Sequence, residues 1–176
     1  SFPTRRSSDL GNSGKVVNQH ELNNEIEAFI QQKDKAKGAY SATDRTYISK
    51  YGGAGGQGSK GASGEGLLYE FFTPDYICEL MWNLAFRYGY EQTGTVLEPS
   101  LGTGNFLKWA KEPSKCYGFE INPVSKRICE ILYPEAKIYE GYFETAFLKA
   151  PRFTERLKDK LTWLEGYPFS LVIGNP

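Results

Sequence analysis

The sequence predicts an α/β fold with a mainly parallel sheet, of which the chain supplies four strands. Three observations lead to this prediction. Short β-prone runs recur at 95–97, 116–120, 136–139 and 169–173, amphipathic stretches lie between several of them, and a Gly-x-Gly turn follows the first run. Strand, glycine turn and helix in this order are typical of a unit that binds a nucleotide-like ligand at the carboxyl end of a strand.

The glycine turn is the centre of this organisation. It lies in the stretch Leu97-Glu98-Pro99-Ser100-Leu101-Gly102-Thr103-Gly104-Asn105-Phe106. Gly102 and Gly104 permit positive φ and let a ligand approach the backbone closely. Leu107 stands where a dinucleotide fingerprint has its third glycine, and no Gly-Lys-Ser/Thr follows the turn. A pyrophosphate is therefore not the expected ligand, although a Gly-x-Gly alone also fits any tight strand-to-helix turn.

The acidic side chain of Glu98 limits which charged groups the expected ligand carries. An acidic side chain directly before the turn repels a phosphate and suits a ligand that carries an ammonium and a sulfonium group. The stretch 106–110 after the turn is apolar, and we expect it to begin a helix.

Length and composition limit the class of protein. With 176 residues the chain has room for about one domain with a substantial core. The 21 basic and 21 acidic residues balance, so contact with a nucleic acid would come from a local patch or from a part outside this chain. Three scattered cysteines without a Cys-x-x-Cys pair argue against a disulfide scaffold or structural zinc. Without a membrane-length apolar run or a signal-peptide pattern, we predict a cytoplasmic protein with no metal and no membrane partner.

The region before the predicted domain is expected to be an extension. Residues 1–10 resemble a translated sequencing adapter, and the alternative is a disordered basic arm. We predict a helix and a glycine-rich linker over 11–66. The helix, at 17–37, has an apolar face formed by Leu22, Ile26, Phe29 and Ile30. The glycine-rich stretch 51–66 is predicted to be flexible, or else a loop that orders over a bound ligand. The domain itself is expected at 67–176.

A second helix is predicted to begin beside the glycine turn. We expect Thr73 to cap its N-terminus, Pro74 to take the first helical position and Asp75 to complement the helix dipole. Apolar residues at helical spacing predict a buried face formed by Ile77, Leu80, Met81, Leu84, Ala85 and Tyr88. Such a helix N-terminus suits a carboxylate.

Glu120 ends the second predicted strand, 22 positions after Glu98. An acid about 20 residues beyond a glycine turn is placed to accept hydrogen bonds from ribose hydroxyls. Without the glycine turn, the same glutamate would be interpreted as an ordinary acidic residue in a loop. A helix is predicted at 123–133 and a charged helix at 152–164, the latter with a solvated face or, less favoured, a phosphate contact. The last strand leads into Gly174, Asn175 and Pro176.

Four of these stretches resemble the amino-methyltransferase branch of the class I S-adenosylmethionine-dependent methyltransferases. The nearest match is with the adenine-N6 DNA methyltransferases of restriction–modification systems and mobile elements. Phe72-Thr73-Pro74 is similar to the family's N-terminal cofactor motif, 97–106 to its glycine motif and 118–123 to its ribose motif. Val172-Ile173-Gly174-Asn175-Pro176 resembles the opening of the catalytic Asn-Pro-Pro-Tyr/Phe motif. The resemblance implies a Rossmann-like class I methyltransferase fold, truncated after its first four strands.

The resemblance also implies roles for individual residues. Thr73 would hold the methionine carboxylate of S-adenosyl-L-methionine, Glu98 its ammonium and Glu120 its ribose. Ile121 and Phe143 would enclose the adenine. The residues implied to contact the cofactor are Thr73, Pro74, Glu98, Pro99, Ser100, Leu101, Gly102, Thr103, Gly104, Asn105, Phe106, Glu120, Ile121 and Phe143. Asn175 and Pro176 would be catalytic, because they would accept hydrogen bonds from the N6 amine of an adenine flipped out of DNA.

The sequence also departs from the family. Tyr142 stands where the family often has an acid, which leaves the adenine amine to Glu144 or to a backbone group. The second proline and the aromatic residue of the catalytic motif are not in the chain. We therefore predict the N-terminal part of a DNA methyltransferase, inactive by itself, which meets DNA mainly through a missing C-terminal region, with a fused nuclease or helicase as an option. The alternatives are a methyltransferase acting on a protein glutamine amide or on RNA adenine, and a non-catalytic cofactor-binding module of a helicase-like protein.

Overall fold

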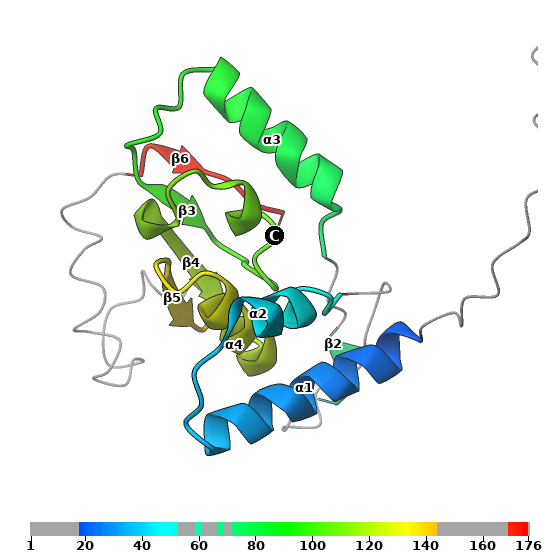
Figure 1. The fold of residues 1–176 in the computed structure, drawn as a ribbon. Helices are drawn as coiled ribbons and strands as arrows, with labels where there is room; N and C mark the ends of the chain where they lie inside the picture. Colours follow the sequence, from blue (N-terminus) through cyan, green and yellow to red (C-terminus); the bar gives the residue numbers. More distant parts are fainter. Residues whose placement is uncertain (1–17, 53–58, 61–66, 69–71, 144–168, 176) are drawn as a thin grey trace, which may run out of the picture.

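The computed structural model describes residues 18–52, 59–60, 67–68, 72–143 and 169–175 of the protein. Its centre is a sheet composed of β3 (Val96–Glu98), β4 (Cys116–Glu120), β5 (Lys137–Glu140) and β6 (Leu171–Val172). The strands are ordered β5-β4-β3-β6, and every neighbouring pair is parallel (Figure 1). The predicted α/β, Rossmann-like fold with four parallel strands is confirmed. The predicted charged helix at 152–164, Glu144 and Pro176 lie outside the described residues.

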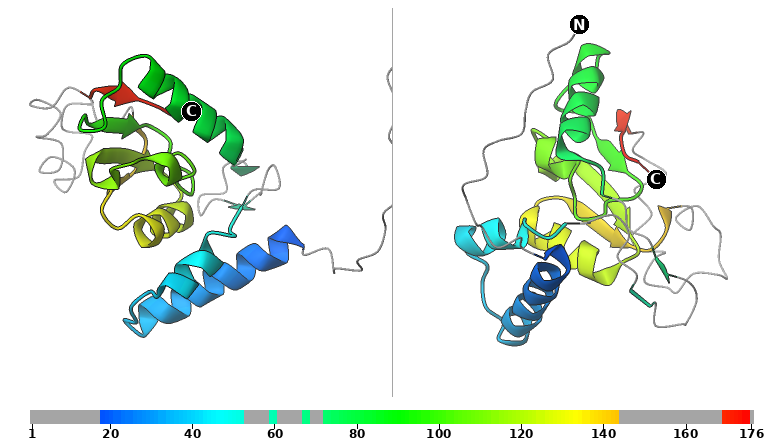
Figure 2. Two further views of the ribbon diagram at one scale, coloured as in Figure 1. Left: turned by 45° about the horizontal axis from the view of Figure 1, so that its top comes forward. Right: turned by 90° about the vertical axis from the view of Figure 1, so that its right-hand side faces the viewer.

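The order of the strands creates a switch point between β3 and β6. From β3 the chain continues to β4 and β5 on one side, and it then returns to β6 on the other side of β3 (Figures 1 and 2). In open α/β sheets ligands bind outside the carboxyl ends of the strands at such a point. The topology therefore directs attention to the ends of β3 and β6.

The two faces of the sheet are packed differently. Val96 and Cys116 face a core that they share with helix α3 (Asp75–Arg87) and helix α4 (Pro123–Leu132). Leu97 and Phe119 point the other way, because side chains alternate along a strand. They are packed by partly buried aromatic side chains, namely Tyr117, Tyr139, Phe143 and Phe169.

Helix α3 begins one residue later than predicted and buries a different stripe. Pro74, not Thr73, is the N-cap residue, and no side chain of the described residues caps this end. The helix buries Cys78 and Trp82, whose indole donates a 2.8 Å hydrogen bond to the carbonyl of Phe106. The prediction of a buried face through Leu80, Leu84 and Tyr88 was wrong, because these side chains are 52%, 39% and 82% exposed.

The stretch after the glycine turn also differs from the prediction. Instead of starting an α-helix, it forms the short 3₁₀ helix η1 (Leu107–Trp109), which Ala110 ends in an extended conformation. Leu107 is buried in the core beside α3, and Trp109 donates to Asp75 at the start of α3. A second 3₁₀ turn, η2 (Pro113–Lys115), leads directly into β4.

The N-terminal extension packs against α4. The predicted first helix is confirmed as α1 (Gln19–Lys35), and a helix that was not predicted follows as α2 (Ala42–Ile48). Ser41 and Asp44 form a capping box at the start of α2, a spacing that is visible in the sequence. Residues from α1, α2 and α4 share one apolar cluster, whose buried members are Ile26, Ile30, Ile48, Tyr51, Ile128 and Ile131.

Part of the glycine-rich stretch is paired. Strand β1 (Ser59–Lys60) runs antiparallel to β2 (Leu67–Leu68). Residues 53–58 and 61–66 of that stretch lie outside the described residues, so its role as a linker or an ordering loop stays a prediction. The division of the chain at residue 66 also stays a prediction, although α1 and α2 pack on α4 of the following part.

Candidate ligand-binding site

Three polar residues meet at the carboxyl edge of the sheet. Glu98 ends β3, Glu120 ends β4, and Asn175 follows β6 after Ile173 and Gly174. Gly174 lies against the first of these, because a Cβ at its position would be 3.4 Å from Cγ of Glu98. The strand order thus brings together three of the sequence motifs, although Glu98 and Asn175 lie 77 positions apart in the chain.

Glu120 is buried and already accepts hydrogen bonds from the backbone. It is 8% exposed. The N–H of Gly102 donates to its Oε2 at 2.6 Å, and the N–H of Asn122 donates to its Oε1 at 2.7 Å. The carboxylate therefore fixes the glycine turn and the start of α4. A carboxylate has about four lone-pair sites, so it can accept more than these two hydrogen bonds.

Glu98 has a contrasting environment. It is only 2% exposed, and its Oε2 is a buried polar side-chain atom without a hydrogen-bond partner in the described part of the chain. Burial, and secondarily the charge of Glu120, raise the pKa of Glu98 well above its ordinary value. A buried polar atom without a partner costs free energy, which a ligand that supplies a donor can recover.

The glycines of the turn are required by conformation and by packing within the protein. Gly102 has a φ of 54° and Gly104 a φ of 86°. A Cβ at Gly104 would lie 2.7 Å from the ring of Tyr133, and one at Gly102 would lie 3.1 Å from the ring of Phe72. Protein side chains therefore occupy the space beside both α-carbons, which differs from our expectation that the glycines leave that space to a ligand.

Leu101 anchors the turn to the next strand. Its N–H donates to the carbonyl of Phe119 at 2.9 Å, and its side chain covers Gly118. A Cβ at position 118 would lie 2.4 Å from Cγ of Leu101. This contact joins the glycine turn to the ribose-type stretch 118–123, and the sequence showed no sign of it beyond the glycine itself.

Thr73 connects the N-terminal motif with the glycine turn and with the stretch that contains Asn175. Its carbonyl accepts a 2.9 Å hydrogen bond from Nδ2 of Asn105, in the glycine turn. Its hydroxyl lies 3.4 Å from Nδ2 of Asn175. Pro74 is exposed beside it and begins α3. The structure thus brings the predicted residues Thr73, Asn105 and Asn175 together.

Asp75 is a residue whose role the sequence analysis missed. It accepts from Nζ of Lys108 at 2.7 Å and from Nε1 of Trp109 at 2.9 Å. The hydrogen bond from Lys108 holds the pKa of Asp75 below its ordinary value. Asp75 therefore fastens the segment after the glycine turn to the start of α3. Its place in the first turn of a helix indicated only a favourable charge.

A cavity of about 360 Å³ adjoins the glycine turn. It lies between the end of α2, the start of α3 and the C-terminal half of α4. Its lining residues are Ile48, Ser49, Lys50, Tyr51, Gly52, Asp75, Thr103, Asn105, Lys108, Ile128, Leu132 and Tyr133. Two residues of the predicted cofactor motif, Thr103 and Asn105, thus face a concave surface.

The remaining predicted residues are placed in different ways. The side chain of Phe106 is 3% exposed and belongs to the hydrophobic core. Phe143 packs edge-on against Phe119, with ring centroids 5.5 Å apart. Pro99 and Ile121 are half-buried, and Ser100 is exposed. That Ile121 and Phe143 enclose an adenine stays a prediction.

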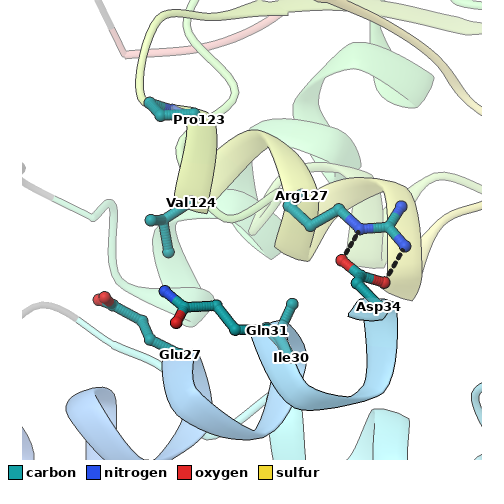
Figure 3. A pocket seen from close by; sticks show the side chains of 7 residues that line it. All are labelled: Glu27, Ile30, Gln31, Asp34, Pro123, Val124 and Arg127. Atoms are coloured by element: carbon teal, nitrogen blue, oxygen red, sulfur yellow. Dashed lines mark hydrogen bonds and ion pairs between the residues drawn. The ribbon is translucent and has the colours of Figure 1, made fainter. Parts of the chain in front are cut away.

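A second pocket of about 190 Å³ lies between α1 and α4. Figure 3 shows its lining residues, Glu27, Ile30, Gln31, Asp34, Pro123, Val124 and Arg127. Arg127 donates to both carboxylate oxygens of Asp34, from Nε at 2.8 Å and from Nη2 at 2.6 Å (Figure 3). None of the predicted site residues lines this pocket.

The described residues hold no group of three or more His, Cys, Asp or Glu side chains that could bind a metal ion. Among the helices of this part of the chain, none is long and apolar enough to cross a membrane.

The fold and its polar edge define a Rossmann-like α/β protein with a candidate ligand site at the switch point of its sheet. No protein-family model matches the chain. The chain is 34% identical over 107 residues to "Defense against restriction protein B" of Escherichia phage P1, and this alignment covers 61% of the chain but 4% of that protein. The chain therefore spans a small fraction of the length of this curated relative.

Among solved structures, the protein is similar to the type I restriction-modification system methyltransferase subunit from Streptococcus thermophilus. The TM-score is 0.41 at 18% sequence identity, over 74% of this chain and 25% of that one.

Proposed function

We propose that the carboxyl edge of the sheet binds S-adenosyl-L-methionine and that the chain is the N-terminal part of an adenine-N6 DNA methyltransferase. The observation that carries the proposal is Glu98, a buried carboxyl at the switch point between β3 and β6 whose Oε2 has no hydrogen-bond partner in the part of the chain that the structure describes. An ammonium group supplies the hydrogen-bond donors and the positive charge that this position lacks. The residues present therefore fit the amino-acid part of the cofactor.

The chain's own residues would bind and orient the cofactor. When bound, S-adenosyl-L-methionine supplies the methyl group together with its leaving group, so the protein needs little acid–base chemistry. The Thr73 hydroxyl would donate to the carboxylate, Glu98 would accept from the ammonium, and Glu120 would accept from the ribose hydroxyls. Holding the reactants in line is the contribution expected of these contacts.

Asn175 would act on the methyl acceptor. The exocyclic amine of adenine is a poor nucleophile, because its lone pair is delocalised into the ring. An amide oxygen that accepts a hydrogen bond from this amine interacts more strongly as the nitrogen becomes tetrahedral, and this lowers the barrier. Asn175 is exposed and lies beside Thr73, so the acceptor and cofactor sites would adjoin. Pro176 is assigned the same role by the resemblance alone.

DNA is the acceptor that we favour. The name of the phage relative refers to defence against restriction, a process directed at DNA. We infer that the present chain also acts on DNA. The balanced charge of the chain is consistent with DNA contacts made mainly by other parts of a longer polypeptide.

Isothermal titration of the chain with S-adenosyl-L-methionine tests the proposal. Glu98→Ala and Glu120→Ala should each raise the Kd by at least about tenfold, since each removes hydrogen bonds to the ligand worth about 1.5–3 kcal/mol. Glu140→Ala is the matched control, because Glu140 is an exposed acid at the end of the neighbouring strand β5. Circular dichroism checks that each variant is folded. A folded chain that binds nothing, or that binds equally well without Glu98, would contradict the proposal.

A further inference from the structure

Two buried carboxyl groups lie at the ends of adjacent strands. Glu98 and Glu120 are 2% and 8% exposed, and the register pairs Glu98 with Gly118, two residues before Glu120. Both side chains lie on the face of the sheet that α3 and α4 cover, because they alternate with Leu97 and Phe119 on the opposite face. Two like charges in one buried place are unfavourable, so ionisation of one disfavours ionisation of the other.

The surroundings decide which of the two carries the charge. Glu120 accepts hydrogen bonds from two backbone N–H groups, which stabilise its ionised form. Oε2 of Glu98 accepts none from the described residues, and burial favours the neutral form of this group. Environments that separate the ionisation of two neighbouring acids assign a different protonation state to each.

The groups that face Glu98 supply no positive charge. They come from each element packed around it and are Cys78 of α3, Cys116 and Glu120 of β4, and Cys129 and Tyr133 of α4. Burial is the first cause that raises the pKa of each of the three thiols and of the phenol, so all four are neutral near pH 7. Within the described part of the chain Glu98 forms no ion pair with a lysine or an arginine.

We propose that Glu98 selects a ligand with an ammonium group by exchanging its own proton for that cation. The identity of the ligand rests on the proposed function. In the ligand-free protein the carboxyl group of Glu98 is neutral. When the ammonium enters, the O–H bond of Glu98 breaks, the proton passes to the solvent, and the ammonium N–H groups donate to the resulting carboxylate. No covalent bond to the ligand forms, and one positive charge replaces another.

This exchange makes a prediction that distinguishes two related ligands. S-Adenosylhomocysteine carries the ammonium, whereas methylthioadenosine has the same adenine, ribose and sulfur without it. The first should release about one proton on binding at pH 7, and the second about none, because proton release equals the change in bound protons. Titration calorimetry in phosphate and in Tris measures this number, since the two buffers differ in their heat of ionisation.

Glu98→Gln provides the matched variant. It keeps the size and the neutral state of the side chain, so the fold should be retained. It should abolish the proton release with S-adenosylhomocysteine and weaken its binding at least about tenfold, while methylthioadenosine should bind to both proteins within about twofold. Equal proton release in the variant and the unmodified chain, or equal release with both ligands, would overturn the inference.

A measurement on the ligand-free protein separates this inference from the proposed function. The side-chain carboxyl carbon of Glu98 is observable by ¹³C NMR, and its resonance is identified by its loss in Glu98→Gln. We expect the chemical shift of a neutral acid at pH 7. A carboxylate shift at that pH would overturn the inference even if the cofactor binds. If instead no cofactor binds but Glu98 is neutral, the proposed function fails and the protonation of Glu98 stands.

Discussion

Acidic side chains are held in two different ways on the two sides of α4. In the interface with α1, the Asp34 side chain is 37% exposed and accepts two hydrogen bonds from Arg127. At the sheet edge, Glu98 is 2% exposed, and its Oε2 has no partner among the described residues. The hydrogen bonds from Arg127 lower the pKa of Asp34, whereas burial raises that of Glu98.

The charge of Asp34 stabilises the contact between two helices, whereas the carboxyl group of Glu98 is suited to binding a ligand. A half-exposed ion pair fastens two helices at little desolvation cost, and it contributes little net free energy. A buried acid without a hydrogen-bond partner destabilises the ligand-free protein. A ligand that supplies a hydrogen-bond donor recovers this free energy. Three experiments test whether Asp34 and Glu98 have these different roles, and they differ in the size of the effect expected.

The largest effect should appear in the pH dependence of unfolding. The native-state pKa of Glu98 is raised, so the native state binds more protons than the unfolded state above the unfolded pKa of about 4.3. The contribution of Glu98 to stability is therefore fully present below that pH and is lost as the pH rises through the native pKa. Relative to Glu98→Gln, the unmodified chain should lose roughly 1.4 kcal/mol per pH unit across this window.

Urea unfolding of both proteins at a series of pH values from 4 to 8 measures the effect. Glu140→Gln serves as the control, because it removes an exposed acid from the end of β5 in the same sheet. If the curves of the unmodified chain and of Glu98→Gln run parallel over this range, Glu98 is not the buried neutral acid that the structure indicates.

A smaller effect is expected from crowding the glycine turn. In Gly118→Ala the new methyl group would meet the Leu101 side chain at 2.4 Å, so the turn must shift. We expect a loss of about 1–3 kcal/mol in the free energy of unfolding, as for overpacked cores, together with weaker ligand binding. Gly52→Ala is the control, because the nearest atom lies 3.7 Å from its Cβ position. Binding that is unaffected in a folded Gly118→Ala protein would argue against a ligand site formed by this turn.

The smallest effect should come from the interface between α1 and α4. A double-mutant cycle with Asp34→Asn and Arg127→Met should give a coupling energy of about 0.5–1 kcal/mol that falls with added salt. Binding of S-adenosyl-L-methionine should be unchanged, since neither residue lies at the sheet edge. A marked loss of binding would show that the interface between α1 and α4 is coupled to the ligand site at the sheet edge.

The parallel strands and the acids at their ends could be predicted from the order of residues in the chain. Short apolar runs that end at Glu98 and Glu120 appear as β3 and β4, and the glycine turn lies between them as predicted. Parallel strands align their carboxyl ends, so residues that end strands must share one edge of the sheet. This inference uses only the position at which each strand ends and the common direction of the strands. It requires no knowledge of side-chain packing.

Which surfaces are buried and which charges have partners depends on contacts between residues far apart in the chain, so the folded structure was needed to see them. Helix α3 has apolar residues on more than one side, and the stripe with Trp82 is buried because the backbone carbonyl of Phe106 is there to accept from its indole. The same holds for the two glutamates. Backbone N–H groups of the turn and of the residue that caps α4 donate to Glu120, whereas Oε2 of Glu98 has no hydrogen-bond partner among the described residues. These three-dimensional contacts are not encoded by spacing along the chain.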